Sequence, residues 1–198
     1  YDDLNALFAG SEQQLAAMAP LADTLRTMRT VAGKLRARRQ AKGCIDFEID
    51  EPSFVLDENG EPVEIITRER GEAEMMIEDF MLAANECVAR FARENRVPLL
   101  YRVHEKPDAE KLAIFADFLD AIGVSAKNIR HDAAPGDIRA LLEKTHDRPE
   151  HSVITTLALR SMQKARYDIN PLGHYGLAMA DYCHFTSPIR RYPDLVVS

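Results

Sequence analysis

The sequence predicts an α+β fold, in which long helices pack on a small mixed, partly antiparallel sheet. Long segments with apolar residues at three- and four-residue spacing are typical of amphipathic helices. Short segments of alternating or apolar residues lie among them, and two of these are joined by an Asn-Gly turn, which indicates a β-hairpin. No linker or internal repeat divides the chain, so we expect residues 1–198 to form one domain or part of one.

Helices are expected in the first forty residues. Residues 11–19 read as a short helix, and Pro20 starts a longer helix that runs to about Ala41. Gly33 weakens this second helix, and Gly43 ends it. Its apolar side chains recur at helical spacing, at Leu21, Leu25, Met28, Val31 and Leu35.

A small antiparallel sheet is expected next. Its strands are predicted at residues 44–49, 53–56 and 63–67, because apolar and polar residues alternate there. The Asp-Glu-Asn-Gly sequence at 57–60 joins the last two strands as a hairpin turn.

Residues 70–95 are expected to form a second long helix. Its buried stripe is predicted to consist of Ile77, Phe80, Met81, Ala84, Val88 and Phe91. A strand, three helices, two more strands and a final helix complete the expected order. We place them at 99–103, 107–122, 135–144, 152–165, 175–179 and 182–185, and from Ser187 onward.

The composition favours a cytoplasmic globular protein. Hydrophobic residues make up 46% of the chain, which is enough to fill a core. The three cysteines show no C-x-x-C spacing, so neither a disulfide framework nor a zinc knuckle is expected. No signal peptide and no apolar run of bilayer length is present, so we expect a soluble protein without membrane association.

The formal net charge of −7 argues against a nucleic-acid-binding protein when taken alone. The charge is unevenly distributed, however, because residues 24–45 contain seven basic residues and no acidic one. A solvated helix face is the commoner interpretation of such a run. The basic residues are Arg26, Arg29, Lys34, Arg36, Arg38, Arg39 and Lys42.

The C-terminal segment contains a strong local signal. The Thr-Ser-Pro sequence at 186–188 combines a hydroxyl cap with proline at the first helical position, which predicts a helix start. Arg190 and Arg191 then fall in the first turn, so backbone N–H groups and two guanidinium groups converge on one place. Such a place suits a phosphate group. A surface ion pair between Arg190 and Asp194 is the alternative interpretation.

This segment resembles the end of the RNB domain of the ribonuclease II and ribonuclease R exoribonucleases, in the form found in ribonuclease R. The matching residues are His184-Phe-Thr-Ser-Pro-Ile-Arg-Arg-Tyr-Pro-Asp194. The resemblance extends over the chain, through Tyr1-Asp-Asp3, Gly43-Cys-Ile-Asp-Phe47, Met76-Ile-Glu-Asp-Phe-Met-Leu-Ala-Ala-Asn85, Tyr101-Arg-Val-His-Glu-Lys-Pro107 and Leu159-Arg-Ser-Met-Gln-Lys-Ala-Arg-Tyr167. It implies that residues 1–198 are the C-terminal part of an RNB domain.

The resemblance also implies an activity. The longer protein is expected to be a monomeric, processive 3′–5′ exoribonuclease that hydrolyses single-stranded RNA, and not DNA, to nucleoside 5′-monophosphates. Family members use two divalent metal ions, here expected to be Mg²⁺, held by a D-x-x-x-x-x-D-x-D-D element upstream of the position of Tyr1. That element is absent from this sequence, so the resemblance implies that the isolated fragment is inactive.

Two residues are expected to act at the scissile phosphate. The resemblance assigns this phosphate to Arg190, with Arg191 in support, and a planar guanidinium suits dispersed phosphoryl charge. The resemblance also implies that Tyr1 contacts the phosphate from the opposite side. From the residues alone, a terminal tyrosine carries no functional weight.

Three further residues are expected to contact the RNA. The resemblance makes Phe47 a stacking residue near the catalytic chamber, although a core phenylalanine at a strand end is the alternative. Glu78 and Asn85 are seven residues apart and so lie on one line of a helix, where they could grip a ribose. Exposed polar residues without a ligand are the alternative, and the resemblance favours the RNA contact, at Glu78 rather than Asp79.

The six histidines show neither an H-E-x-x-H motif nor close ligand spacing, so no histidine metal site is predicted. Two other functional classes stay open from the residues. One is a catalytically inactive RNA-binding or regulatory module, whose longer protein would lack the aspartate element. The other is a purely structural α+β domain.

Overall fold

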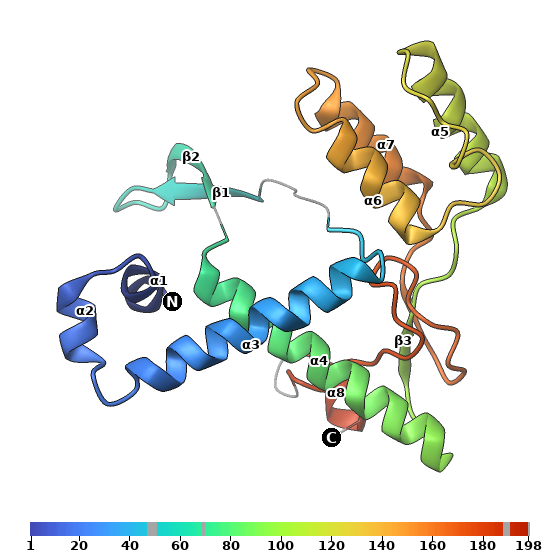
Figure 1. Cartoon of the computed structure of the whole chain (residues 1–198). Helices are drawn as coiled ribbons and strands as arrows, with labels where there is room; N and C mark the ends of the chain where they lie inside the picture. The colour runs from blue at the N-terminus through green and yellow to red at the C-terminus, as the bar shows by residue number, and fades with distance from the viewer. Residues whose placement is uncertain (47–50, 69, 188–190, 198) are drawn as a thin grey trace. The chain divides into compact units, whose positions relative to one another are not determined.

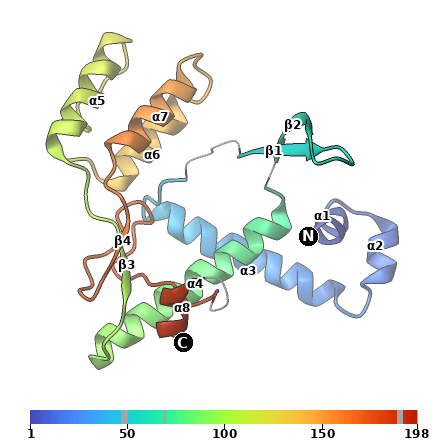
Figure 2. The ribbon, with the colours of Figure 1, turned by 180° about the vertical axis from the view of Figure 1, so that it is seen from behind.

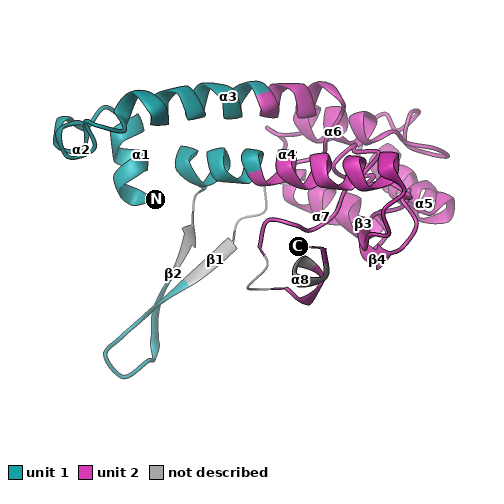
Figure 3. Cartoon of the chain, turned by 90° about the horizontal axis from the view of Figure 1, so that it is seen from below, with its two compact units in different colours: residues 1–34, 48–80 teal, residues 35–47, 81–198 magenta. Residues whose placement is uncertain are grey.

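The computed structural model describes residues 1–46, 51–68, 70–187 and 191–197, without the side chains of 51–53, 66–68 and 194–196. Helices and two small antiparallel sheets alternate, which confirms the predicted α+β class. The chain divides into two compact units, shown in Figure 3. Unit 1 contains residues 1–34 and 48–80, and unit 2 contains residues 35–47 and 81–198.

Unit 1 combines N-terminal helices with the first hairpin. The helices are α1 (Asp2–Phe8), α2 (Glu12–Ala17), the first part of α3 (Ala22–Ala41) and the start of α4 (Glu72–Asn95). The hairpin pairs β1 (Glu51–Leu56) with β2 (Pro62–Arg68) in antiparallel register, as the Asn-Gly signal predicts. The carboxylate of Asp57 accepts hydrogen bonds from the backbone N–H groups of Asn59 and Glu61, at 2.8 and 2.9 Å, which fixes the turn.

The start of α4 is capped by a residue from a distant part of the sequence. The side-chain oxygen of Asn5 accepts a hydrogen bond from the backbone N–H of Ala73 at 2.8 Å, and its amide donates to Glu74 at 2.8 Å. These bonds satisfy one of the helix donors that otherwise has no partner. Asn5 thereby ties α1 to α4 within unit 1.

Unit 2 has a core formed by three helices that lie side by side in Figures 1 and 2. They are α5 (Ala109–Ala121), α6 (Pro135–Lys144) and α7 (His151–Ser161). Their buried side chains form one apolar cluster, which includes Leu112, Phe115, Leu119, Ile138, Ile154 and Ala158. At the end of α3, Gly43 has φ of +91°, and a Cβ there would lie 2.8 Å from the backbone nitrogen of Gly136. Glycine is therefore required at position 43, and it ends the helix as predicted.

The second of the two sheets belongs to unit 2 and lies against α4. It pairs β3 (Tyr101–Val103) with β4 (Arg166–Asp168) in antiparallel register. On the other edge of β3, the backbone N–H of Arg102 donates to the carbonyl of Tyr182 at 2.9 Å. Ala89 of α4 packs with Tyr101, Val103 and Cys183, and Val197 of α8 (Tyr192–Val197) packs against this cluster.

Several expected elements differ from those observed. Residues 44–46 are not a strand, and the rest of the predicted strand at 44–49 lies outside the described residues. The helix predicted at 152–165 is observed at His151–Ser161, so it is shorter than expected at its C-terminal end. Residues 166–168, for which no strand was predicted, pair with β3. The predicted strands 175–179 and 182–185 are reduced to isolated bridges, because Tyr182 and Cys183 contact β3 over too short a stretch to form a strand.

The final helix begins later than predicted. It starts at Tyr192, with Pro193 in its first turn, so Arg191 precedes the helix. Ser187 is not helical, so the expected cap at 186–188 does not start α8. The helix has six residues, and the placement of Arg190, on which the predicted phosphate site depends, lies outside the described residues.

The buried stripe of α4 is also rotated relative to the prediction. Ala89 and Ala92 are buried, whereas Phe91 is 63% exposed. Small side chains occupy the buried line because β3 and the C-terminal segment approach this part of the helix closely. Periodicity alone selected the larger apolar residues, which flank that line.

Candidate functional site

Asn85 is the centre of a buried polar cluster in unit 2. It lies on α4 and only 3% of it is exposed. Its side-chain oxygen accepts hydrogen bonds from the backbone N–H groups of Phe185 and Thr186, at 3.0 and 3.2 Å. Its side-chain amide donates to the hydroxyl of Tyr182 at 3.2 Å, and the Cys183 thiol donates to its backbone carbonyl at 3.5 Å.

These four contacts fix the chain that leads into the C-terminal motif. Residues 182–186 run along α4, and Arg190 lies only four residues after Thr186 in the sequence. A buried amide that satisfies two backbone donors is costly to remove, because both donors would lose their partner. Asn85 therefore holds the backbone of Phe185 and Thr186, which precede Arg190 and Arg191 in the sequence.

An ion pair strengthens the same attachment one residue before Tyr182. The guanidinium Nε of Arg93 on α4 donates to Oδ1 of Asp181 at 2.7 Å. Asp181 is almost fully buried, whereas Arg93 is half-exposed. The hydrogen bond to Asp181, followed by the charge of that carboxylate, raises the pKa of Arg93.

Aromatic and histidine rings continue from this cluster. The ring of Tyr182 lies between His174 and His184, with centroid distances of 5.3 and 5.8 Å. Nδ1 of His184 is 2.8 Å from the hydroxyl of Tyr167, and the guanidinium of Arg102 lies 4.8 Å from the Tyr167 ring centroid. The network links β3, β4 and the C-terminal segment through edge-to-face contacts.

The inner histidines of this network are held neutral. Burial, followed by electrostatic interaction with the neighbouring His104 ring and with Arg102, lowers the pKa of His174 to about 3. Burial also lowers the pKa of His104. Nδ1 of His174 accepts a hydrogen bond from the backbone N–H of Leu177, and Nδ1 of His104 accepts one from Gly176. Neutral imidazole rings are required for both contacts.

The structure places the predicted site residues in different regions. Arg190 and Phe47 lie outside the described residues. Arg191 is half-buried and directly precedes α8. Tyr1 belongs to unit 1 and is 62% exposed.

Glu78 and Asn85 differ in their surroundings, although they lie on the same helix. Glu78 is exposed and forms an ion pair with Arg70 at 3.4 Å within unit 1. Asn85 is buried in unit 2 and uses its side chain on contacts within the chain. The expected ribose contact at Asn85 stays a prediction, and in the described structure its side chain contacts Tyr182, Phe185 and Thr186.

Sequence reasoning missed the residues that support Asn85. Tyr182, Asp181 and Arg93 carry no motif of their own, and their partners lie about ninety residues away in the sequence. The run of histidines and tyrosines between 167 and 184 is the signal that could have indicated a ring network.

Metal ligation was tested on the described part of the chain. There, no group of three or more histidine, cysteine, aspartate or glutamate side chains could hold a metal ion. The described residues do not fit the two-metal site that the resemblance implies, and the aspartate element is absent from the sequence. Among these same residues, no helix is long and apolar enough to cross a bilayer.

Comparison with known proteins identifies the class. Residues 1–198 match the family described as the RNB domain. The chain therefore belongs to the RNB family, and the proposed resemblance is confirmed.

Two curated relatives are ribonuclease R proteins. The chain is 43% identical over 197 residues to ribonuclease R 1 of Lactococcus lactis, covering 100% of the chain and 24% of the relative. It is 46% identical over 179 residues to ribonuclease R of Thermotoga maritima, covering 90% of the chain and 25% of the relative. The chain thus spans about a quarter of the length of these relatives.

Solved structures show the same fold. RNase R of Mycoplasma genitalium, in complex with ribose-methylated single-stranded RNA, matches with a TM-score of 0.88 at 31% identity, covering 100% of this chain and 31% of that one. Yeast Ssd1, described as a pseudonuclease, matches with a TM-score of 0.63 at 26% identity, covering 87% of this chain and 22% of that one.

Proposed function

We propose that this chain is part of a processive 3′–5′ exoribonuclease that hydrolyses single-stranded RNA to nucleoside 5′-monophosphates. The match to the RNB domain over residues 1–198, together with relatives named ribonuclease R that align over the whole chain, carries this proposal. The structural similarity to an RNase R bound to single-stranded RNA supports RNA as the substrate.

In this proposal, the C-terminal segment supplies charge stabilisation to the reaction. As water attacks the terminal phosphodiester, negative charge disperses over the phosphoryl oxygens, and the guanidinium of Arg190 donates to them. Arg191 supports that site, and Tyr1 contacts the phosphate from the other side. Asn85 supports this role by holding the backbone of Phe185 and Thr186, a few residues before the two arginines in the sequence.

Binding of the RNA is assigned to groups that do not read base identity. Phe47 stacks on a base, and the carboxylate of Glu78 accepts a hydrogen bond from a ribose hydroxyl. Stacking and sugar contacts are available to every nucleotide, so degradation is independent of sequence. Divalent metal ions, expected to be Mg²⁺, would activate water in the longer protein, on carboxylates that are not in this chain.

A second function is favoured by one observation. The similarity to the yeast pseudonuclease Ssd1 extends over 87% of the chain. A fold of this kind therefore also occurs in a protein described as a pseudonuclease. The alternative is that this chain belongs to a catalytically inactive RNA-binding or regulatory protein.

An RNA hydrolysis assay with the full-length natural protein that contains this chain distinguishes the two functions. We expect it to release nucleoside 5′-monophosphates from a 3′-tailed RNA in the presence of magnesium, one nucleotide at a time. The Arg190→Ala variant should lose about 10²- to 10³-fold in rate, as when one charge-stabilising donor is removed. Unchanged hydrolysis by this variant would contradict the role of Arg190. RNA binding without any nucleotide release would establish the alternative.

A further inference from the structure

A basic groove lies in unit 2, and none of the residues that contact the Asn85 side chain lines it. It has a volume of about 720 Å³ and is lined by the end of β3, by α5, by the end of α7 and by the segment that leads into β4. Its basic residues are Lys111, Arg160, Lys164 and Arg166, and its one acidic residue is Glu105. The groove thus concentrates positive charge in a chain whose formal net charge is −7.

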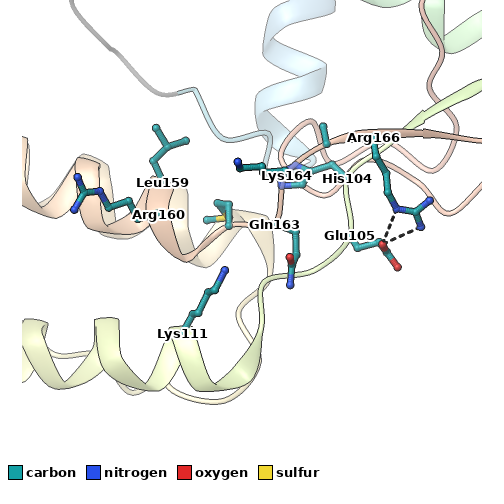
Figure 4. A pocket seen from close by; sticks show the side chains of 10 residues that line it. His104, Glu105, Lys111, Leu159, Arg160, Gln163, Lys164 and Arg166 are labelled. Atoms are coloured by element: carbon teal, nitrogen blue, oxygen red, sulfur yellow. Dashed lines mark hydrogen bonds and ion pairs between the residues drawn. The ribbon is translucent and has the colours of Figure 1, made fainter.

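One of the four cations is neutralised within the chain. Arg166 forms ion pairs with Glu105, at 3.0 Å, and with Asp168. Figure 4 shows the Glu105 contact at one end of the groove. These pairs use the only carboxylate of the groove lining, so Glu105 is not directed at the other cations.

The remaining three cations are exposed and surround the groove. Lys111 projects from α5, whereas Arg160 and Lys164 lie on the α7 side (Figure 4). Among the described residues, none of these three forms an ion pair with a carboxylate. Three such charges around one groove create a local potential that attracts an anion with several charges.

The other lining residues indicate whether the groove suits the phosphates or the bases of a nucleic acid. The side chains of Leu159, Met162 and Ala165 are apolar, and Gln163 is uncharged. His104 also lines the groove, and burial lowers its pKa, so it adds no charge near neutral pH. The lining contains no phenylalanine, tyrosine or tryptophan on which a base could stack.

We propose that Lys111, Arg160 and Lys164 bind the phosphate backbone of RNA at a contact additional to the Arg190 site. This inference rests on the proposed function. The alternative of an acidic protein segment is less favoured, because the related Mycoplasma genitalium protein is described in complexes with single-stranded and with double-stranded RNA. The contact would be independent of sequence and sensitive to salt.

Binding of a fluorescein-labelled, ribose-methylated single-stranded RNA to the full-length natural protein tests the groove. Dissociation constants are measured in the presence of EDTA for the wild-type protein and for the triple variant Lys111→Gln/Arg160→Gln/Lys164→Gln, called the groove variant. Each phosphate contact contributes about 0.7 to the slope of log K against log salt for a single strand, so the slope should fall by about 2. Near 0.1 M salt, we expect the affinity to fall about 10- to 100-fold.

A control variant removes two positive charges, compared with three in the groove variant, elsewhere in the same unit. Lys127 and Lys144 are exposed, and they line a separate hollow near α6. We expect Lys127→Gln/Lys144→Gln to bind with an affinity within about threefold of wild type. An equal loss in both variants would show a general charge effect and would overturn the groove as a site. So would an unchanged slope in the groove variant.

Two further outcomes separate the groove from the proposed function. If wild type and the groove variant bind and degrade RNA equally, only the groove proposal fails. If the wild-type protein binds RNA through the groove and releases no nucleotides, the nuclease function fails and the groove is retained. Competition by polyglutamate at the same charge concentration, as strong as that by RNA, would assign the groove to an acidic protein and contradict the proposal.

Discussion

Two polar regions of unit 2 use their charged and amide groups in opposite ways. Around Asn85, the polar groups are buried and directed at one another, so they hold the C-terminal segment on α4. In the basic groove, Lys111, Arg160 and Lys164 are exposed and, in the described part of the chain, have no carboxylate partner. Buried polar groups with partners determine structure, whereas exposed charges around a groove are available to a ligand.

Removal of the Asn85 side chain should have the largest effect on stability of the changes considered for the two regions. In Asn85→Ala, the backbone donors of Phe185 and Thr186 lose their acceptor, and we expect the free energy of unfolding to fall by about 2 to 4 kcal/mol. Urea denaturation measures this value. Asn85→Asp keeps an acceptor and should recover more than half of the loss. The groove variant serves as the comparison and should change stability by less than about 0.5 kcal/mol.

His174, beside Tyr182, gives the buried region a pH-dependent stability. The pKa of His174 is about 3 in the folded chain and near 6.5 when unfolded, because burial disfavours its charged form. As pH falls below 6.5, the unfolded state gains a proton that the folded state does not accept. Stability should therefore decrease by about 2 kcal/mol by pH 5. Constant stability across this range in urea denaturation would contradict the buried, neutral state of His174, and His174→Gln should flatten the curve.

The ion pair between Arg93 and Asp181 provides a smaller test. Arg93→Met leaves the buried carboxylate of Asp181 without its partner, but Arg93 is half-exposed and its contribution is reduced by solvent. We expect a loss in the free energy of unfolding that is smaller than that of Asn85→Ala. A double-mutant cycle with Asp181→Asn isolates the pair. Additive losses would show that the two side chains do not depend on each other.

Local sequence signals predicted much of the fold. The Asn-Gly turn gave the β1–β2 hairpin, and Pro135 and Lys144 are the observed ends of α6. Gly43 ends its helix because it adopts a positive φ and lies against Gly136. These features depend on residues close together in the sequence, where spacing and propensity are informative.

Contacts between distant segments could not be predicted in this way. Asn85 and Phe185 are one hundred residues apart, and nothing in the spacing of α4 shows that its amide is buried rather than exposed. The same limit explains the rotated stripe of α4, where small alanines face β3. The groove could not be predicted from the sequence, because Lys111 and Arg160 are far apart in the chain and line one groove only after folding.

Single-turnover hydrolysis of labelled RNA by the full-length natural protein tests the contrast most directly. It yields a maximal rate constant and the protein concentration that gives half of that rate. We predict that Asn85→Ala lowers the rate constant at least about tenfold with little change in the half-saturating concentration, because the backbone before the arginines proposed to act at the phosphate loses its hydrogen bonds to Asn85. The groove variant should raise that concentration about 10- to 100-fold and leave the rate constant within about twofold. If both variants change the same parameter, positioning and binding are not separate, and the account is contradicted.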